Sequence, residues 1–160
     1  MAEVPAHPVG SIAWTDLTVP NATEVRDFHA RVVGWKPTEH PMGDYADYNI
    51  LRPGGECVAG ICHARGSNTG LPAQWLIHVI VESVEASAAA CRATGGEVLA
   101  GPRPKGGEAF CVIKDPAGAV MALMEGQGGR EQGDPQQGRT RHGVGKCRGL
   151  GRGRPGYWPW

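Results

Sequence analysis

The 160-residue chain lacks several features that would assign it to a common class of protein. No apolar run approaches the roughly 20 residues that cross a bilayer, so we expect no membrane-spanning segment. The first residues lack a basic start followed by an apolar block, so no signal peptide is expected. No glycine-rich turn follows the strand–G-x-G-x-x-G–helix pattern of a dinucleotide site, so no nucleotide cofactor is indicated.

Cysteine spacing and charge exclude further classes. The five cysteines include no C-x-x-C pair, which argues against a zinc ribbon or a disulfide framework and favours a reducing, cytoplasmic location.

The net charge of zero hides an uneven distribution of charged residues along the chain. Residues 1–126 hold 9 Lys and Arg against 14 Asp and Glu, whereas residues 127–160 hold 7 against 2. An acidic body argues against a nucleic-acid partner.

The C-terminal segment 127–160 differs from the rest of the chain in composition. It has ten glycines and no apolar periodicity before Tyr157. Such a segment cannot bury enough surface to offset its chain entropy, so we expect it to be disordered or only loosely docked. It is either an Arg-Gly arm that contacts RNA or other anionic partners, or an extension without a function.

What the chain does contain is one pattern written twice, at an offset of 62 residues. The alternating strand pattern of 12–19 returns at 76–81, so that His78 corresponds to Asp16. Each unit then continues with a helix and three strands. We therefore divide the chain into the following parts: a flexible lead-in 1–9, module one 10–64, a linker 65–73, module two 74–126 and the tail 127–160.

The helices have recognisable ends. Asn21 is a candidate N-cap for a first helix that Gly34 ends, and Ser83 is a candidate N-cap for a second. Val25, Phe28 and Val32 recur at spacings of three and four, which predicts one apolar stripe packed on the core.

Several motifs in this order resemble those of the vicinal oxygen chelate superfamily, which includes glyoxalases, bleomycin-resistance proteins and extradiol dioxygenases. The motifs are Trp14–Val19, Phe28–Trp35, Val81–Ala86, Gly95–Val98 and Asp115–Gly118. The resemblance covers residues 10–126 and implies an α+β fold, in which paired βαβββ modules form a curled, cup-shaped mixed sheet. It also implies a homodimer, and it leaves open whether modules pair within one chain or between chains.

The resemblance further implies four metal-ligand positions in the cup. They fall on Trp14, Gly60, Leu76 and Ala122, and none of these side chains binds a divalent cation. We therefore expect no metal and no cofactor. The metal-free members of the superfamily, which include drug-sequestering proteins, are the better comparison.

Asp16 and His78 are the candidate catalytic residues. Side chains two apart on a strand share a face, so Asp16 points the same way as Trp14, and His78 the same way as Leu76. If the opening strands of the two modules lie side by side, the carboxylate and imidazole can meet and form an acid–base pair. The alternatives are a purely structural pair and two groups that never meet.

Five further side chains are candidate ligand contacts, because a flat or amphipathic molecule suits a cup lined by aromatic and apolar groups. They are Trp14, Tyr48, Leu76, Phe110 and Cys62. The sequence thus predicts a protein that binds a small, aromatic organic molecule for sequestration or acid–base chemistry. A metal-dependent lyase, isomerase or dioxygenase is the first alternative, and an interaction protein acting through its basic tail is the second.

Overall fold

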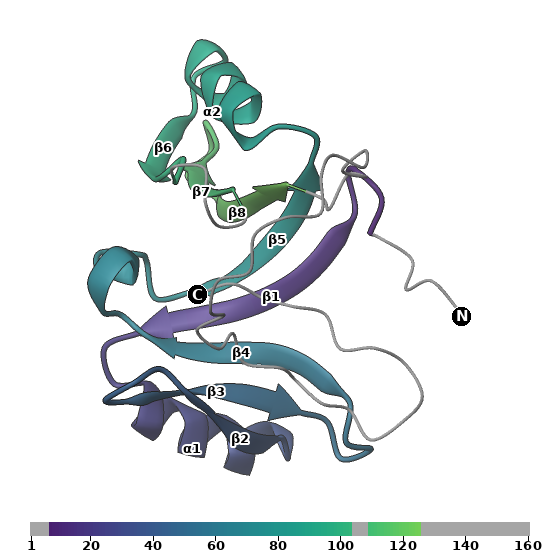
Figure 1. Ribbon diagram of the computed structural model, residues 1–160, viewed down its shortest axis with the longest axis vertical. Coiled ribbons are helices and arrows are strands. Elements are labelled where there is room, and N and C mark those ends of the chain that lie inside the picture. Colours follow the sequence, from purple (N-terminus) through teal and green to yellow (C-terminus); the bar gives the residue numbers. More distant parts are fainter. Residues whose placement is uncertain (1–6, 104–108, 126–160) are drawn as a thin grey trace, which may run out of the picture.

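The computed structural model describes residues 7–103 and 109–125, and the predictions for the tail 127–160 lie outside these residues (Figure 1). The order strand, helix, three strands occurs twice, as the repeat predicts. The first unit comprises β1 (Ile12–Val19), α1 (Ala22–Val33), β2 (Lys36–Pro41), β3 (Ala46–Leu51) and β4 (Cys57–His63). The second comprises β5 (Trp75–Val81), α2 (Val84–Ala93), β6 (Glu97–Ala100), β7 (Phe110–Lys114) and β8 (Val120–Glu125). A short 3-10 helix, η1 (Gly66–Asn68), lies between the two units.

All eight strands form one mixed sheet in the order β2-β3-β4-β1-β5-β8-β7-β6. The first strand of each module pairs in parallel with the last strand of that module, β1 with β4 and β5 with β8. The two opening strands, β1 and β5, pair antiparallel at the centre of the sheet (Figure 1). The predicted fold class is confirmed, and the two modules pair within one chain.

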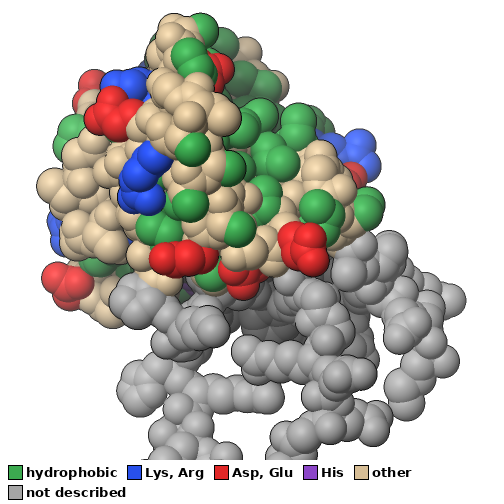
Figure 2. Space-filling model, turned by 90° about the horizontal axis from the view of Figure 1, so that it is seen from above, with side chains coloured by type: hydrophobic (Ala, Val, Ile, Leu, Met, Phe, Trp, Pro, Cys, Tyr) green, Lys and Arg blue, Asp and Glu red, His purple; other side chains and the backbone are tan. Residues whose placement is uncertain are grey.

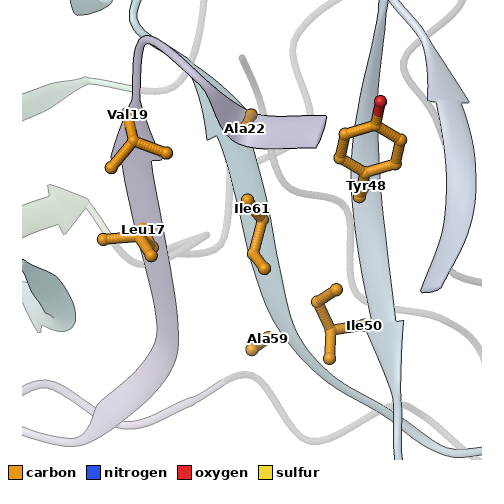
Figure 3. Close-up of a cluster of buried hydrophobic side chains, with 7 residues drawn as sticks. All are labelled: Leu17, Val19, Ala22, Tyr48, Ile50, Ala59 and Ile61. Atoms are coloured by element: carbon orange, nitrogen blue, oxygen red, sulfur yellow. The ribbon is translucent and has the colours of Figure 1, made fainter. Parts of the chain in front are cut away.

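Both helices pack on the same face of this sheet. The first core cluster joins α1 to β1, β3 and β4, and contains Leu17, Val19, Ala22, Tyr48, Ile50, Ala59 and Ile61 (Figure 3). The second joins α2 to β7 and β8, and contains Val84, Ala88, Cys91, Cys111, Ile113 and Leu123. Leu17 pairs with Trp75, and Val79 pairs with Leu123, so the register places both clusters on one side. We call the opposite side the helix-free face.

The apolar stripe of α1 packs on the core only in part, through Val25, which lies against the first core cluster. Only Ala22 of this helix is buried, whereas Phe28 is 58% exposed and Val32 is 66% exposed. A period of 3.6 residues marks an apolar helix face but does not say what covers it. Gly34 ends α1 in the left-handed conformation as predicted, with φ of 78°.

Two further local predictions had different outcomes. Ser83 accepts a hydrogen bond from the backbone nitrogen of Ala86 and caps α2, as predicted. Asn21 makes no such bond; its side-chain amide donates instead to the carboxylate of Glu24, at 2.8 Å.

Strand β2 was not recognised individually in the sequence. Its residues Lys-Pro-Thr-Glu-His-Pro resemble a loop, because proline cannot donate to a sheet ladder. The strand lies at the edge of the sheet and pairs only with β3, so a missing donor is tolerated there.

Two surface features bear on possible partners. Neither α1 nor α2, the two α-helices in the described ranges, is long and apolar enough to cross a membrane. On the face shown in Figure 2, acidic and basic side chains are interspersed among apolar ones rather than gathered into one charged patch.

Candidate ligand site on the helix-free face

Asp16 and His78 meet at the junction of the two modules. The carboxylate Oδ1 of Asp16 lies 3.1 Å from Nε2 of His78, and their side chains are 2% and 0% exposed. Of the three possibilities considered from the sequence, the structure thus excludes the one in which the two groups never meet. The carboxylate therefore faces the edge of the imidazole ring that carries Nε2.

Antiparallel pairing of β1 and β5 explains why two residues 62 apart come together. Asp16 pairs with Leu76, Thr15 with Ile77 and Trp14 with His78, so the local twofold passes between Thr15 and Ile77. Asp16 and His78 are therefore diagonal neighbours on one face, a separation that long side chains can bridge.

The residues around the pair are small or apolar. Gly60 of β4 is opposite Asp16, and a Cβ added at Gly60 would lie 3.3 Å from Cβ of Asp16 and 3.8 Å from the indole of Trp14. Trp14 is partly buried and pairs with His78 across the strands. The absence of a side chain at Gly60 thus leaves space for both the carboxylate and the indole.

Leu76 and Phe110 also lie on the helix-free face, in a third buried cluster with Val112 and Ala122. The ring of Phe110 stacks on the imidazole of His78, with centroids 5.9 Å apart and planes inclined by 27°. One face of the imidazole ring therefore lies against an aromatic ring, and its Nε2 edge faces Asp16.

Cys62 lies on the same face as Thr18, its partner in the register of β1 and β4, and is buried. Burial, together with the nearby carboxylates of Asp16 and Asp47, raises the pKa of the Cys62 thiol well above its usual range. A neutral thiol is a poor nucleophile.

The other cysteines in the described part of the chain are of two kinds. Cys91 and Cys111 are free and buried, like Cys62. Cys57 is disulfide-bonded, which the cysteine spacing did not predict.

Tyr48 is not part of this face, and its assignment to the ligand site needs correction. It pairs with Ile61, packs in the core beneath α1 (Figure 3), and its hydroxyl lies 2.7 Å from that of Thr23. Strand alternation gives the physical reason: Asp47 and Asn49 point to the helix-free face, so Tyr48 between them points to the helices.

A second carboxylate–imidazole pair was missed in the sequence. Oδ1 of Asp47 accepts a 2.8 Å hydrogen bond from the backbone nitrogen of His63, and lies 3.1 Å from Nδ1 of the same residue. Burial, and then the charge of Asp47, raise the pKa of nearby Tyr45. The sequence signal for this pair was the alternation of Asp47 and Asn49 with apolar residues along β3, which places both polar side chains on one face.

Arg103 and Asn68 are two further polar residues near the site that the sequence analysis did not single out. Arg103 lies over the ring of Phe110, and its guanidinium donates to the side chain of Asn68. Neither residue belongs to a periodic pattern or a motif, so local sequence carried no signal for them.

The side chains around Asp16 and His78 do not fit a divalent cation. In the described ranges 7–103 and 109–125, no three His, Cys, Asp or Glu side chains are grouped closely enough to hold one. Asp16 and His78 would supply two ligands, whereas their partners on the outer strands, Gly60 and Ala122, supply none.

The fold and this junction define an α+β protein of paired βαβββ modules with a buried carboxylate–imidazole pair between them. A model of the glyoxalase-like domain matches residues 14–124. The chain therefore belongs to the glyoxalase-like domain family, within the vicinal oxygen chelate superfamily.

Two curated relatives have low sequence identity to this chain. CFP32 of Mycobacterium bovis, a proposed glyoxylase, is 28% identical over 118 residues, which are 72% of this chain and 44% of CFP32. The anthracycline biosynthesis protein DnrV of Streptomyces peucetius is 26% identical over 127 residues, covering 71% of this chain and 46% of DnrV. The chain thus spans less than half the length of these curated relatives.

Among solved structures, a methylmalonyl-CoA epimerase of Streptomyces coelicolor, in complex with 2-nitronate-propionyl-CoA, is similar to this chain. It aligns with a TM-score of 0.43 and 14% identity, over 74% of this chain and 95% of the epimerase.

Proposed function

We propose that this protein binds a small organic molecule on the helix-free face, and that Asp16 and His78 act on it as an acid–base pair. The observation that carries the proposal is the 3.1 Å approach of these two buried side chains at the module junction. Buried ionisable pairs at such positions are candidates for function, because burial is costly unless the charges are used or well compensated.

A second observation concerns the other carboxylate oxygen of Asp16. This Oδ2 is buried and has no hydrogen-bond partner in the described part of the chain. A buried acceptor without a donor is rare and costs free energy. A hydroxyl or amide N–H of a bound molecule would satisfy it and would hold that molecule beside His78.

The chemistry would follow from this placement. With a ligand donor on Asp16, the imidazole of His78 lies where it can take a proton from the molecule or return one to it. Asp16 would stabilise the charged ring during the transfer. Trp14 and Phe110, which lie on either side of His78, would supply apolar contact for a flat ligand.

The relatives support an organic ligand in general terms. One is a proposed glyoxylase, and the name of another places it in anthracycline biosynthesis. Because this chain covers less than half of each, neither activity is transferred to it.

A binding experiment tests the site. A thermal-shift screen of metabolites and aromatic antibiotics would identify a ligand, and quenching of tryptophan fluorescence would then give its affinity. We expect Trp14→Phe to weaken binding, and Asp16→Asn and His78→Gln to reduce affinity or turnover. Trp75→Phe is the matched control, because Trp75 lies on the helix side and packs against His29 and Trp35. Unchanged affinity and turnover in the Asp16 and His78 variants would contradict the acid–base pair.

The same purified protein separates the alternatives. Stoichiometric metal in elemental analysis, lost together with activity on chelation, would favour a metal-dependent enzyme of the superfamily. Partner binding that disappears on deletion of 127–160 would favour an interaction protein.

We also propose that two copies pair through the exposed apolar side of α1. Phe28, Val32 and Val33 are 58%, 66% and 48% exposed, and contiguous exposed apolar side chains favour a protein interface. Sedimentation velocity should show a dimer that Val32→Asp dissociates, whereas Leu99→Asp, at a separate exposed apolar position, should leave it intact. A monomeric wild-type protein would overturn this proposal.

A further inference from the structure

Arg103 is held in place by the backbone that precedes β7. Gly101 has φ of 80°, and a Cβ there would lie 2.5 Å from the carbonyl oxygen of Phe110, so a side chain is excluded. Two residues later, the backbone nitrogen of Arg103 donates to the same carbonyl, at 3.2 Å. The main chain of Arg103 is thus anchored beside Phe110.

The side chain of Arg103 is also positioned. Its guanidinium carbon lies 4.9 Å from the ring centroid of Phe110, and Nη2 donates to Oδ1 of the buried Asn68, at 3.0 Å. The ring of Phe110 in turn stacks on His78. One aromatic ring therefore separates a fixed cation from the Asp16–His78 pair.

This cation has no counter-charge among the residues described. Arg103 is partly buried, and burial lowers the pKa of its guanidinium. No ion pair between described residues includes it. Arg26 differs in this respect: it lies 4.5 Å over the ring of Tyr48 but is paired with Asp27 at 2.8 Å.

A partly desolvated cation without an anionic partner is an unfavourable arrangement that a bound anion corrects. The planar guanidinium offers parallel N–H donors that match the two oxygens of a carboxylate. An arginine held over an aromatic ring, with one nitrogen already used by Asn68, keeps further donors for such a group.

We propose that Arg103 binds the carboxylate of an acidic aromatic ligand, while the body of that ligand lies against Phe110 and the Asp16–His78 pair. The inference rests on the proposed function of the helix-free face and adds the class of ligand and the residue that selects it. Arg103 would be a specificity residue and would take no part in proton transfer.

Matched probes test this selection. Benzoate and 2-naphthoate differ from benzamide and 2-naphthamide mainly in charge, so titration calorimetry of the full chain gives the ratio of affinities within each pair. We expect the wild-type protein to prefer the carboxylate by about tenfold, as a charge-assisted hydrogen-bond pair would provide. Arg103→Gln should bring the ratio close to one, and Arg103→Lys should retain part of it.

Two controls keep the result interpretable. Arg26→Gln removes an arginine that lies over a ring on the other face of the sheet, and it should leave the ratio unchanged. Circular dichroism and thermal unfolding check that each variant is folded, and Arg103→Lys serves if the glutamine variant is not.

The possible failures are distinguishable. Equal affinity for both members of each pair, no binding of either, or a preference that survives Arg103→Gln, would overturn the role of Arg103. Two of these outcomes are equal affinity for both probes and a preference for the carboxylate that survives in Arg103→Gln. If Trp14→Phe weakened the binding of the amides in either of these two outcomes, the proposed site would stand without this inference. If Trp14→Phe changed nothing, the site itself would fail.

Discussion

The coupling between Asp16 and His78 can be measured directly by a double-mutant cycle in urea unfolding. The single variants are Asp16→Asn and His78→Gln, which keep polar side chains of similar size, and the third protein carries both changes. At 3.1 Å, an ionised carboxylate and a protonated imidazole would attract by about 5 kcal/mol at an effective dielectric constant of ~20. The desolvation of both groups offsets most of this attraction, so we expect a coupling free energy of about 1–3 kcal/mol.

The chain contains its own control for this experiment. Asp47 and His63 are also 3.1 Å apart, but the His63 side chain is 12% exposed whereas that of His78 is fully buried. Solvent screens the control pair more strongly, so its cycle of Asp47→Asn and His63→Gln should give about 1 kcal/mol or less. Additive effects at Asp16 and His78, or a coupling no larger than that of the control pair, would refute the reasoning.

Three further perturbations have expected outcomes. Gly60→Ala should lower the unfolding free energy by about 1–2 kcal/mol and weaken ligand binding, because the new methyl group crowds Asp16 at 3.3 Å. Gly54→Ala, whose nearest neighbour would lie 3.8 Å away, should change stability in urea by less than about 0.5 kcal/mol; equal effects would contradict the crowding. Burial raises the pKa of the Cys111 thiol from 9.0 to about 11, because the folded state disfavours the thiolate. The stability that the neutral thiol supplies is therefore complete below pH 9 and is lost as the pH rises toward 11. The free energy of unfolding measured in urea should fall between pH 9 and pH 11, and Cys111→Ala should reduce this fall. The same fall in Cys111→Ala would contradict the role of this thiol. Tyr48→Phe should cost about 1 kcal/mol in urea unfolding through its lost hydroxyl contact and leave ligand affinity unchanged, and a change in affinity would place Tyr48 back in the site.

Much of the fold was predictable because the two modules repeat the same local patterns. The sequence offset between the two repeats relates Asp16 to His78 and identifies the opening strand of each module. The local twofold axis between these two strands then brings equivalent residues together. Gly34 and Ser83 marked helix ends through backbone conformation and capping, which depend on local sequence. Such features need no knowledge of long-range contacts.

The errors arose where the outcome depends on tertiary placement. Phe28 carries the periodicity of a buried helix face, but α1 meets the core through Ala22 and Val25 and leaves Phe28 exposed. For Tyr48 the signal was present, because the alternation along β3 separates it from Asp47 on the other face. Arg103 had no local signal, since only the pairing of β7 with β8 and the position of Gly101 bring it near the site.

The most direct test of the account follows the histidine rings during ligand binding. Nitrogen-15 spectra of histidine-labelled protein, with His78 assigned through His78→Gln, would be recorded as a ligand from the thermal-shift screen is added. The ring signals of His78 should shift in proportion to the bound fraction, while those of His29 on the helix side should stay in place. Saturation of the protein with ligand while the His78 signals remain unmoved would contradict the proposed site.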